Sequence, residues 1–326
     1  MTLSMSRRAV LAGAMLLGAS LPAFAQDKAN LRFSAVFSDK DIRATMMQKL
    51  ADSLSSDFSF ELYYNGSLFK QGTELVALER DNLEMGNIAA QDFAKQVPEW
   101  SILTAAYLFR DADHLKTFFN SEAGAEMKAM VEEKLGVHIL GPTYFGTRQV
   151  GLRVDKKINV PADLAGIKLR MPGGDAWQFL GTALGANPVP MPVTEVYTAL
   201  QTGAVDGQDN PLPNVRTLKF NEVMSQIVLT SHLVGFDVLT VSKKAWDAMS
   251  AEQQQKFQAA ADEAIAWSTA EHRKMESELV DAFKAEGLEL YEPDVAAFRE
   301  HAQKMYLESD LAKSWPAGML DKINAL

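Results

Sequence analysis

The chain has 326 residues, of which 47% are apolar and 23% charged, and its formal net charge is −10. This acidic balance argues against nucleic acid and against an anionic membrane surface as partners. Since the chain has no cysteine, disulfides, thiolate metal sites and cysteine nucleophiles are excluded. The length is typical of two domains or of one large α/β unit.

The first 25 residues predict an export signal. Arg7 and Arg8 precede an apolar run over 9–21, and a small-residue cleavage site ends at Ala25. The two arginines also suit a twin-arginine signal, and the sequence leaves ordinary secretion and twin-arginine export equally open. No later stretch approaches about 18 consecutive apolar residues, so no stable membrane insertion is expected. We therefore expect an exported protein located in a bacterial periplasm.

The following segment alternates between strand and helix patterns. Expected strands lie at 31–36, 58–64 and 83–89, with expected helices at 42–54 and 72–80. This strand–helix order predicts a parallel sheet. A mostly helical stretch is then expected at 113–135, followed by strands at 137–144 and 148–154.

The second half continues the alternation. Expected strands lie at 168–171, 226–231, 238–241 and 288–291, and expected helices at 175–184, 195–201, 295–307 and 311–323. A capping box at 250–253 starts a long amphipathic helix that runs to about 286. Because no Pro-rich or low-complexity linker is present, two domains would have to be joined by crossing strands. A cleft between them would be a natural ligand site.

No pattern in the chain indicates catalysis or a metal centre. The five histidines are scattered without metal-ligand spacing. The nucleophile elbow, the phosphate-binding loop and the dinucleotide-binding turn are all missing from the sequence. We therefore predict no catalytic residue, no metal and no cofactor.

Three polar residues suggest a site for a carboxylate. Arg170 ends an apolar strand directly before a Pro-Gly-Gly turn, and a guanidinium there can hold a carboxylate with two parallel hydrogen bonds. Arg148 enters another strand near the presumed domain junction, and Asn210 follows a tight Asp-Gly turn. Each of them singly could instead pair with a group of the protein itself. As a set they favour a bound acid.

The segments 163–172 and 195–211 resemble the central signature of TRAP-transporter solute-binding proteins, the DctP family. The similarity runs in order from about residue 31 to about residue 306 and includes 83–86 and 107–111. It implies an α/β periplasmic binding-protein fold, in which two domains with mixed sheets are connected by a hinge and enclose a ligand cleft. It also implies a periplasmic receptor that closes over a small organic acid and delivers it to TRAP permease membrane subunits.

The resemblance implies a division of the chain and roles for the three polar residues. We expect one domain at 26–145 and 234–273, and the other at 146–233 and 274–326. In the family pattern Arg170 forms the salt bridge with the ligand carboxylate, Arg148 joins it, and Asn210 hydrogen-bonds the same end of the ligand.

Five further residues are candidates for contacts with the ligand: Asp39, Gln71, Glu74, Trp177 and Phe236. The first three are expected at the end of the ligand away from the arginines. For Trp177, core packing is the stronger interpretation than stacking on the ligand. Phe236 is expected to line either the cleft or the hinge.

A carboxylate clamp with polar groups at the far end suits a hydroxylated acid. The run at 175–181 also resembles family members associated with sugar acids. Our leading hypothesis is therefore a uronate or a related sugar acid. The alternative is a C4-dicarboxylate or another small monocarboxylate, including keto and aromatic acids. A ligand-sensing receptor and a periplasmic enzyme remain as lower-ranked functions, and the sequence leaves the oligomeric state open.

Overall fold

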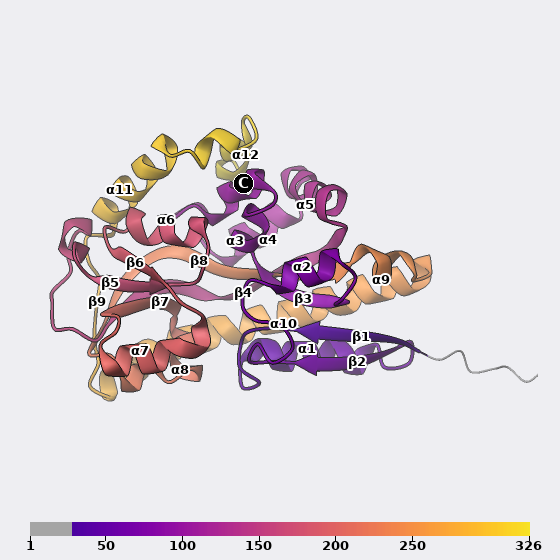
Figure 1. Cartoon of the computed structure of the whole chain (residues 1–326), viewed down its shortest axis with the longest axis horizontal. Coiled ribbons are helices and arrows are strands. Elements are labelled where there is room, and N and C mark those ends of the chain that lie inside the picture. The colour runs from indigo at the N-terminus through magenta and orange to yellow at the C-terminus, as the bar shows by residue number, and fades with distance from the viewer. Residues whose placement is uncertain (1–27) are drawn as a thin grey trace, which may run out of the picture.

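The computed structural model describes residues 28–326, so the predicted export signal lies outside the described residues (Figure 1). One mixed sheet of nine strands forms the centre, in the order β2-β1-β3-β8-β4-β7-β5-β6, with β9 paired to β8. The strands are β1 Ala29–Ser34, β2 Phe58–Tyr63, β3 Met85–Ala89, β4 Val137–Leu152, β5 Lys168–Met171, β6 Asn187–Pro190, β7 Gly207–Pro211, β8 Gln226–Ser242 and β9 Glu289–Tyr291.

Helices cover the sheet and connect its strands. The α-helices are α1 Ile42–Ser53, α2 Glu74–Glu79, α3 Ala90–Ala94, α4 Ala112–Phe119, α5 Glu122–Leu135, α6 Asp175–Ala183, α7 Val196–Thr202, α8 Leu212–Thr217, α9 Lys243–Asp247, α10 Ala251–Ala285, α11 Val295–Glu308 and α12 Met319–Asn324. Short 3-10 turns are η1 Pro98–Thr104, η2 Pro161–Leu164, η3 Val193–Glu195, η4 Phe220–Glu222 and η5 Ala312–Ser314. None of the helices from residue 28 onward combines the length and the apolarity that crossing a membrane requires.

The predicted α/β class and mixed sheet are confirmed. The opening strands are parallel as expected, since β1 pairs in parallel with both β2 and β3. The capping box on Ser250 and Gln253 starts α10, a helix of 35 residues. Figure 1 shows β1 to β3 in one half of the molecule and β5 to β7 in the other, with β4, β8 and α10 running through both. The predicted domain boundaries at 145/146 and 233/234 fall within these two crossing strands.

Six predicted elements are joined or divided in the structure. The separate strands expected at 137–144 and 148–154 are one strand, β4, and those at 226–231 and 238–241 are one strand, β8. The register of the β4–β8 pairing shifts at bulges, and the antiparallel pairing continues on both sides of each shift. The helix expected at 113–135 is divided where Ser121 caps α5. The helix expected at 311–323 is divided at Pro316, which precedes α12.

A bulge lies where the crossing strands pass between the halves. Phe145 is the extra residue of β4, between the pairs Tyr144↔Phe236 and Gly146↔Gly235. Gly146 has φ +113°, and a Cβ there would lie 2.6 Å from the Pro211 Cβ, so this position requires glycine. Because a bulge redirects the side chains beside it, Phe145 and Arg148 both reach the pocket described below.

Glu276 on α10 stabilises this bulge through two hydrogen bonds. Its Oε1 accepts from the Thr147 backbone N–H at 2.6 Å, and its Oε2 accepts from the Tyr144 hydroxyl at 2.5 Å. β7 ends at Pro211, opposite Arg148, so no strand covers the Thr147 N–H on this side. The Glu276 carboxylate therefore supplies the acceptor that a longer β7 would have provided.

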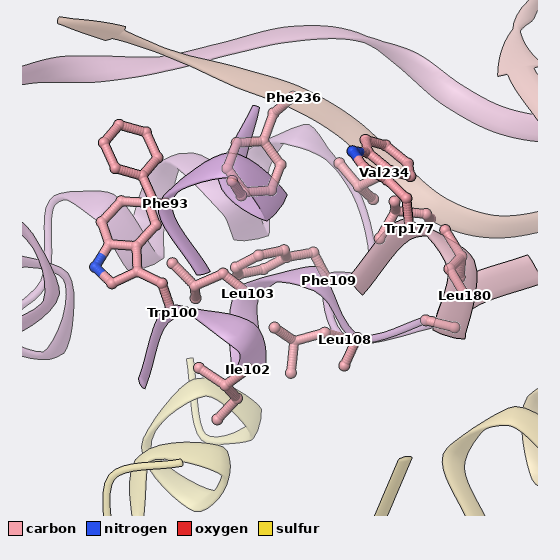
Figure 2. Close-up of a cluster of buried hydrophobic side chains, with 14 of the residues drawn as sticks. Phe93, Trp100, Ile102, Leu103, Leu108, Phe109, Trp177, Leu180, Val234 and Phe236 are labelled. Carbon is pink, nitrogen blue, oxygen red and sulfur yellow. The ribbon is translucent and has the colours of Figure 1, made fainter. Parts of the chain in front are cut away.

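The largest core cluster packs η1, α3 to α5 and α6 around the crossing strands. Figure 2 shows Phe93, Trp100 and Phe109 within it, together with Phe236 of β8 and Trp177 of α6. Phe236 makes edge contacts with Phe109 and Phe119 at centroid distances of 5.9 and 5.7 Å. These aromatic contacts fix one face of β8 against the helices, so that its other face is available to the pocket.

Candidate functional site

A pocket lies where the loops after β1 and β2 meet residues of β4, β5, β7 and η3. It encloses about 740 Å³ of space, part of it continuous with solvent. Six of the eight predicted ligand contacts line it: Gln71, Glu74, Arg148, Arg170, Trp177 and Asn210. The site also contains residues that the sequence analysis did not select: Phe37, Asp41, Arg43, Asn87, Asp92, Phe145, Val193, Asn214 and Asp237.

Two predicted contacts lie elsewhere. Asp39 is exposed and its Oδ1 accepts from the Ser38 hydroxyl at 3.2 Å, whereas Asp41, two residues on, is buried in the pocket wall. Phe236 packs in the aromatic core, as Figure 2 shows. The structure thus assigns neither residue to the pocket lining.

Arg170 is a buried cation at the end of β5, with only 1% of its surface exposed. Its Nε donates to the Met191 carbonyl at 2.8 Å, and its Nη2 lies 3.4 Å from Gln71 Oε1. Within residues 28–326, no carboxylate oxygen comes within 4.0 Å of its guanidinium. Burial lowers the pKa of Arg170 to about 9, against the opposing effect of Asp209. A charge held so deep without a counterion is unfavourable, so the pocket is suited to an anion.

Arg148, by contrast, already has an internal partner. Its Nε and Nη2 donate to the two carboxylate oxygens of Asp209 at 2.8 and 2.7 Å, and Nη2 also reaches the Asp209 carbonyl. His232 Nε2 donates to the same carboxylate at 3.0 Å. Although burial opposes it, Arg148 holds the pKa of Asp209 far below its usual range, whereas burial lowers that of His232. The ion pair orients Arg148 over the Trp177 ring, 4.8 Å from its centroid.

Asn210 and Trp177 complete this cationic end. Asn210 lies in β7, and its Nδ2 donates to Gln208 Oε1 at 2.6 Å. Its Oδ1 has only a long contact, at 3.5 Å, from the Asn214 amide. Trp177 is 6% exposed and lies both in the core cluster and in the pocket lining, so packing and contact with a ligand are compatible.

The far end of the pocket is built around Arg43. Its guanidinium is sandwiched between the Phe37 and Phe145 rings at 4.3 and 4.2 Å. It donates to both oxygens of Asp41, at 2.9 and 2.8 Å, and to Asp237 at 2.7 Å. Burial raises the pKa of Asp237 to about 6 although Arg43 opposes the change. Asp41 is the N-cap of α1. An acidic residue directly before the predicted helix 42–54 is the sequence signal that could have located this cluster of Asp41, Arg43 and Asp237.

Glu74 lies between the two ends, at the start of α2. Its Oε2 accepts from the backbone N–H groups of Gly72 and Thr73 at 2.8 and 3.0 Å. Burial raises its pKa to about 7, and the nearby Asp92 acts in the same direction. A carboxyl group with this pKa can donate as well as accept hydrogen bonds near neutral pH. In the described part of the chain, no three His, Asp or Glu side chains are grouped so as to hold a metal ion.

The sequence matches the family described as bacterial extracellular solute-binding protein, family 7 (DctP) over residues 33–311. A TRAP periplasmic solute-binding protein from Roseobacter denitrificans, solved with bound 3-deoxy-D-manno-oct-2-ulosonic acid (KDO), superposes with a TM-score of 0.90 at 46% identity. That comparison covers 92% of this chain and 99% of the other.

Two curated relatives have lower identity. The sialic acid-binding periplasmic protein SiaP of Vibrio cholerae is 32% identical, over 80% of this chain and 82% of its own length. The C4-dicarboxylate-binding periplasmic protein DctP of Shewanella loihica is 29% identical, over 84% of this chain and 82% of its own length. This chain therefore belongs to the DctP family of TRAP-transporter solute-binding proteins, whose members are receptors for small acids.

Proposed function

We propose that this protein is the periplasmic receptor of a TRAP transporter and that its ligand is a sugar acid. The observation that carries this proposal is Arg170, a buried guanidinium without a carboxylate partner in the described chain. A ligand carboxylate would provide the missing counterion. Since Arg148 and Asn210 line the same pocket, they are placed to assist with further polar contacts.

The far end of the pocket favours hydroxyl groups over a second carboxylate. Its cation, Arg43, is already bound by Asp41 and Asp237. A dicarboxylate would place its second charge beside these two acidic side chains, with no unpaired cation to receive it. Hydroxyls can instead donate to Asp237 or exchange hydrogen bonds with Asn87 and Glu74. We therefore rank a C4-dicarboxylate below a polyhydroxylated monocarboxylate.

Among sugar acids we place ulosonic acids ahead of uronates. The relative at 46% identity was solved with KDO, an eight-carbon ulosonic acid. The relative at 32% identity is named for sialic acid, which belongs to the same chemical class. Both acids combine a carboxylate with a chain of hydroxyls, which fits a pocket with one cationic and one mixed polar end.

Binding would act by closing the two halves around the acid. The crossing strands β4 and β8 and helix α10 connect the halves, and the bulge at Phe145 provides a place to bend. In this proposal the boundaries near 145/146 and 233/234 separate the moving bodies. Ligand contacts to both halves would shift the population toward the closed form, which presents the acid to the permease. Receptor function alone requires no turnover.

Isothermal titration calorimetry of the mature chain with KDO, sialic acid, galacturonate and succinate tests the ligand class. We expect the tightest binding for an ulosonic acid, weaker binding for the uronate and none for succinate. Binding of succinate with no response to any sugar acid would refute the proposal. Proton NMR of the bound acid after prolonged incubation should show it unchanged, whereas a new product would indicate an enzyme.

A further inference from the structure

Gln71 makes an unusual contact across the pocket. It lies in the loop between β2 and α2, yet its Oε1 accepts from the Val193 backbone N–H at 2.8 Å and lies 3.4 Å from Arg170 Nη2. Val193 begins η3 and Arg170 lies near the end of β5, so both donors belong to the half of the molecule that contains β5 to β7. A single amide oxygen thus connects the β2–α2 loop to the cationic end of the pocket.

The loop that carries Gln71 is held in a defined shape. Thr73 donates through its N–H and its hydroxyl to the Lys70 carbonyl at 3.0 and 2.8 Å, which closes a tight turn around Gln71. Gly72 has φ +83°, and its N–H is bound by Glu74. Because the turn is bound at these points, the direction of the Gln71 side chain does not depend on its own two contacts alone.

The chemistry of residue 71 determines whether Arg170 is available. An amide oxygen is neutral, so it accepts a hydrogen bond without neutralising the guanidinium. A carboxylate of the same shape would place a negative charge about 3.4 Å from Arg170 Nη2. At that distance, in a buried site, it would form an ion pair and replace a ligand carboxylate as counterion.

We infer that Gln71 holds the β2–α2 loop against the cationic end of the pocket through its hydrogen bond to Val193. We also infer that Arg170 remains available to a ligand carboxylate because the Gln71 side chain is uncharged. This inference rests on the proposed function. It assigns two separate properties to one side chain. The hydrogen bond to Val193 favours the closed arrangement, and the lack of charge determines that an external acid can bind.

The two properties are separated by two substitutions. Gln71→Ala removes the hydrogen bond to Val193 but leaves Arg170 without a counterion, so the acid should still bind, about tenfold more weakly. Gln71→Glu keeps an acceptor for Val193 and adds an internal counterion, so binding should weaken by about 100-fold or more. Gln255→Glu, an exposed residue on α10, is the matched control for the added charge and should bind as wild type does.

The ligand-free variants provide a test that does not depend on which acid binds. Gln71→Glu should raise the unfolding midpoint and reduce the radius of gyration in small-angle X-ray scattering, since the internal ion pair favours closure. Both effects should disappear when Gln71→Glu is introduced together with Arg170→Met and the double variant is compared with Arg170→Met alone. A double variant that is more stable or more compact than Arg170→Met alone, or a Gln71→Glu protein that binds KDO as tightly as wild type, would overturn the inference. If wild type binds another acid instead, the scattering and unfolding results still decide the role of Gln71.

Discussion

Replacing Arg170 with methionine is expected to stabilise the ligand-free protein while it abolishes binding of the acid. The guanidinium is fully buried, and its pKa is lowered from 12.5 to about 9. Since one pKa unit corresponds to about 1.4 kcal/mol, burial disfavours the charged side chain by on the order of 5 kcal/mol. Methionine has a similar length and places no charge at this buried position.

Part of this gain is offset. The substitution leaves the Met191 carbonyl without the donor that Arg170 provides at 2.8 Å, which costs about 1–3 kcal/mol. We therefore expect a net increase of about 2–4 kcal/mol in the free energy of unfolding. This increase would identify Arg170 as a residue kept for function at the expense of stability.

Urea unfolding followed by tryptophan fluorescence measures the stability, and calorimetric titration measures the binding. Arg148→Met is the matched comparison, because it removes an arginine from the same pocket but leaves the buried Asp209 carboxylate without its cation and with only His232 as a side-chain partner. We expect it to lower the free energy of unfolding by about 3–5 kcal/mol. If Arg170→Met is destabilised as strongly as Arg148→Met, or retains micromolar binding, Arg170 has a structural role and our reasoning about the site is wrong.

Three further predictions concern the pocket and the hinge. Because the folded pKa of Glu74 is raised from 4.5 to about 7, the folded protein retains a proton that the unfolded chain releases, and stability falls as pH rises through this range. Glu74→Gln should make the free energy of unfolding, measured with urea, less dependent on pH in this range. An unchanged pH dependence would contradict the raised pKa of Glu74. Glu276→Gln should lower the free energy of unfolding by about 1–3 kcal/mol and weaken ligand binding, and wild-type values in both measurements would refute its role at the bulge. Gly146→Ala should lower the melting temperature because its φ is +113°, whereas Gly173→Ala, with no atom within 4 Å of an added Cβ, should leave it unchanged.

The local sequence was sufficient for most of the elements. Hydrophobic periodicity located β1 to β3, and the capping box located the start of α10, because such signals depend on residues a few positions apart. The same reasoning divided β4 and β8 into four strands. Nothing local shows that a strand continues through a bulge, because the continuation depends on pairing with residues about 90 positions away.

The candidate site shows the same limit. The motif around Arg170, Arg148 and Asn210 indicated one end of the pocket, since β5 and β7 are parallel and end at the same edge, where Arg148 of β4 lies opposite Pro211. The far end was missed, because Arg43 reaches the pocket only through its stacking between Phe37 and Phe145 and its pairing with Asp237. Asp39 was selected instead, from its place in the loop, although its side chain is exposed.

By itself, the sequence determined the family, the α/β class and the arginines that suit an acid, because these follow from motifs and periodicity along the chain. Only the tertiary structure decided which arginine is free. Arg148 and Arg170 have the same chemistry and lie at the same end of the pocket, and the fold brings Asp209 to Arg148 while it leaves Arg170 with a carbonyl and an amide. Whether a buried charge has a counterion depends on which distant strands become neighbours, and that is a property of the assembled sheet.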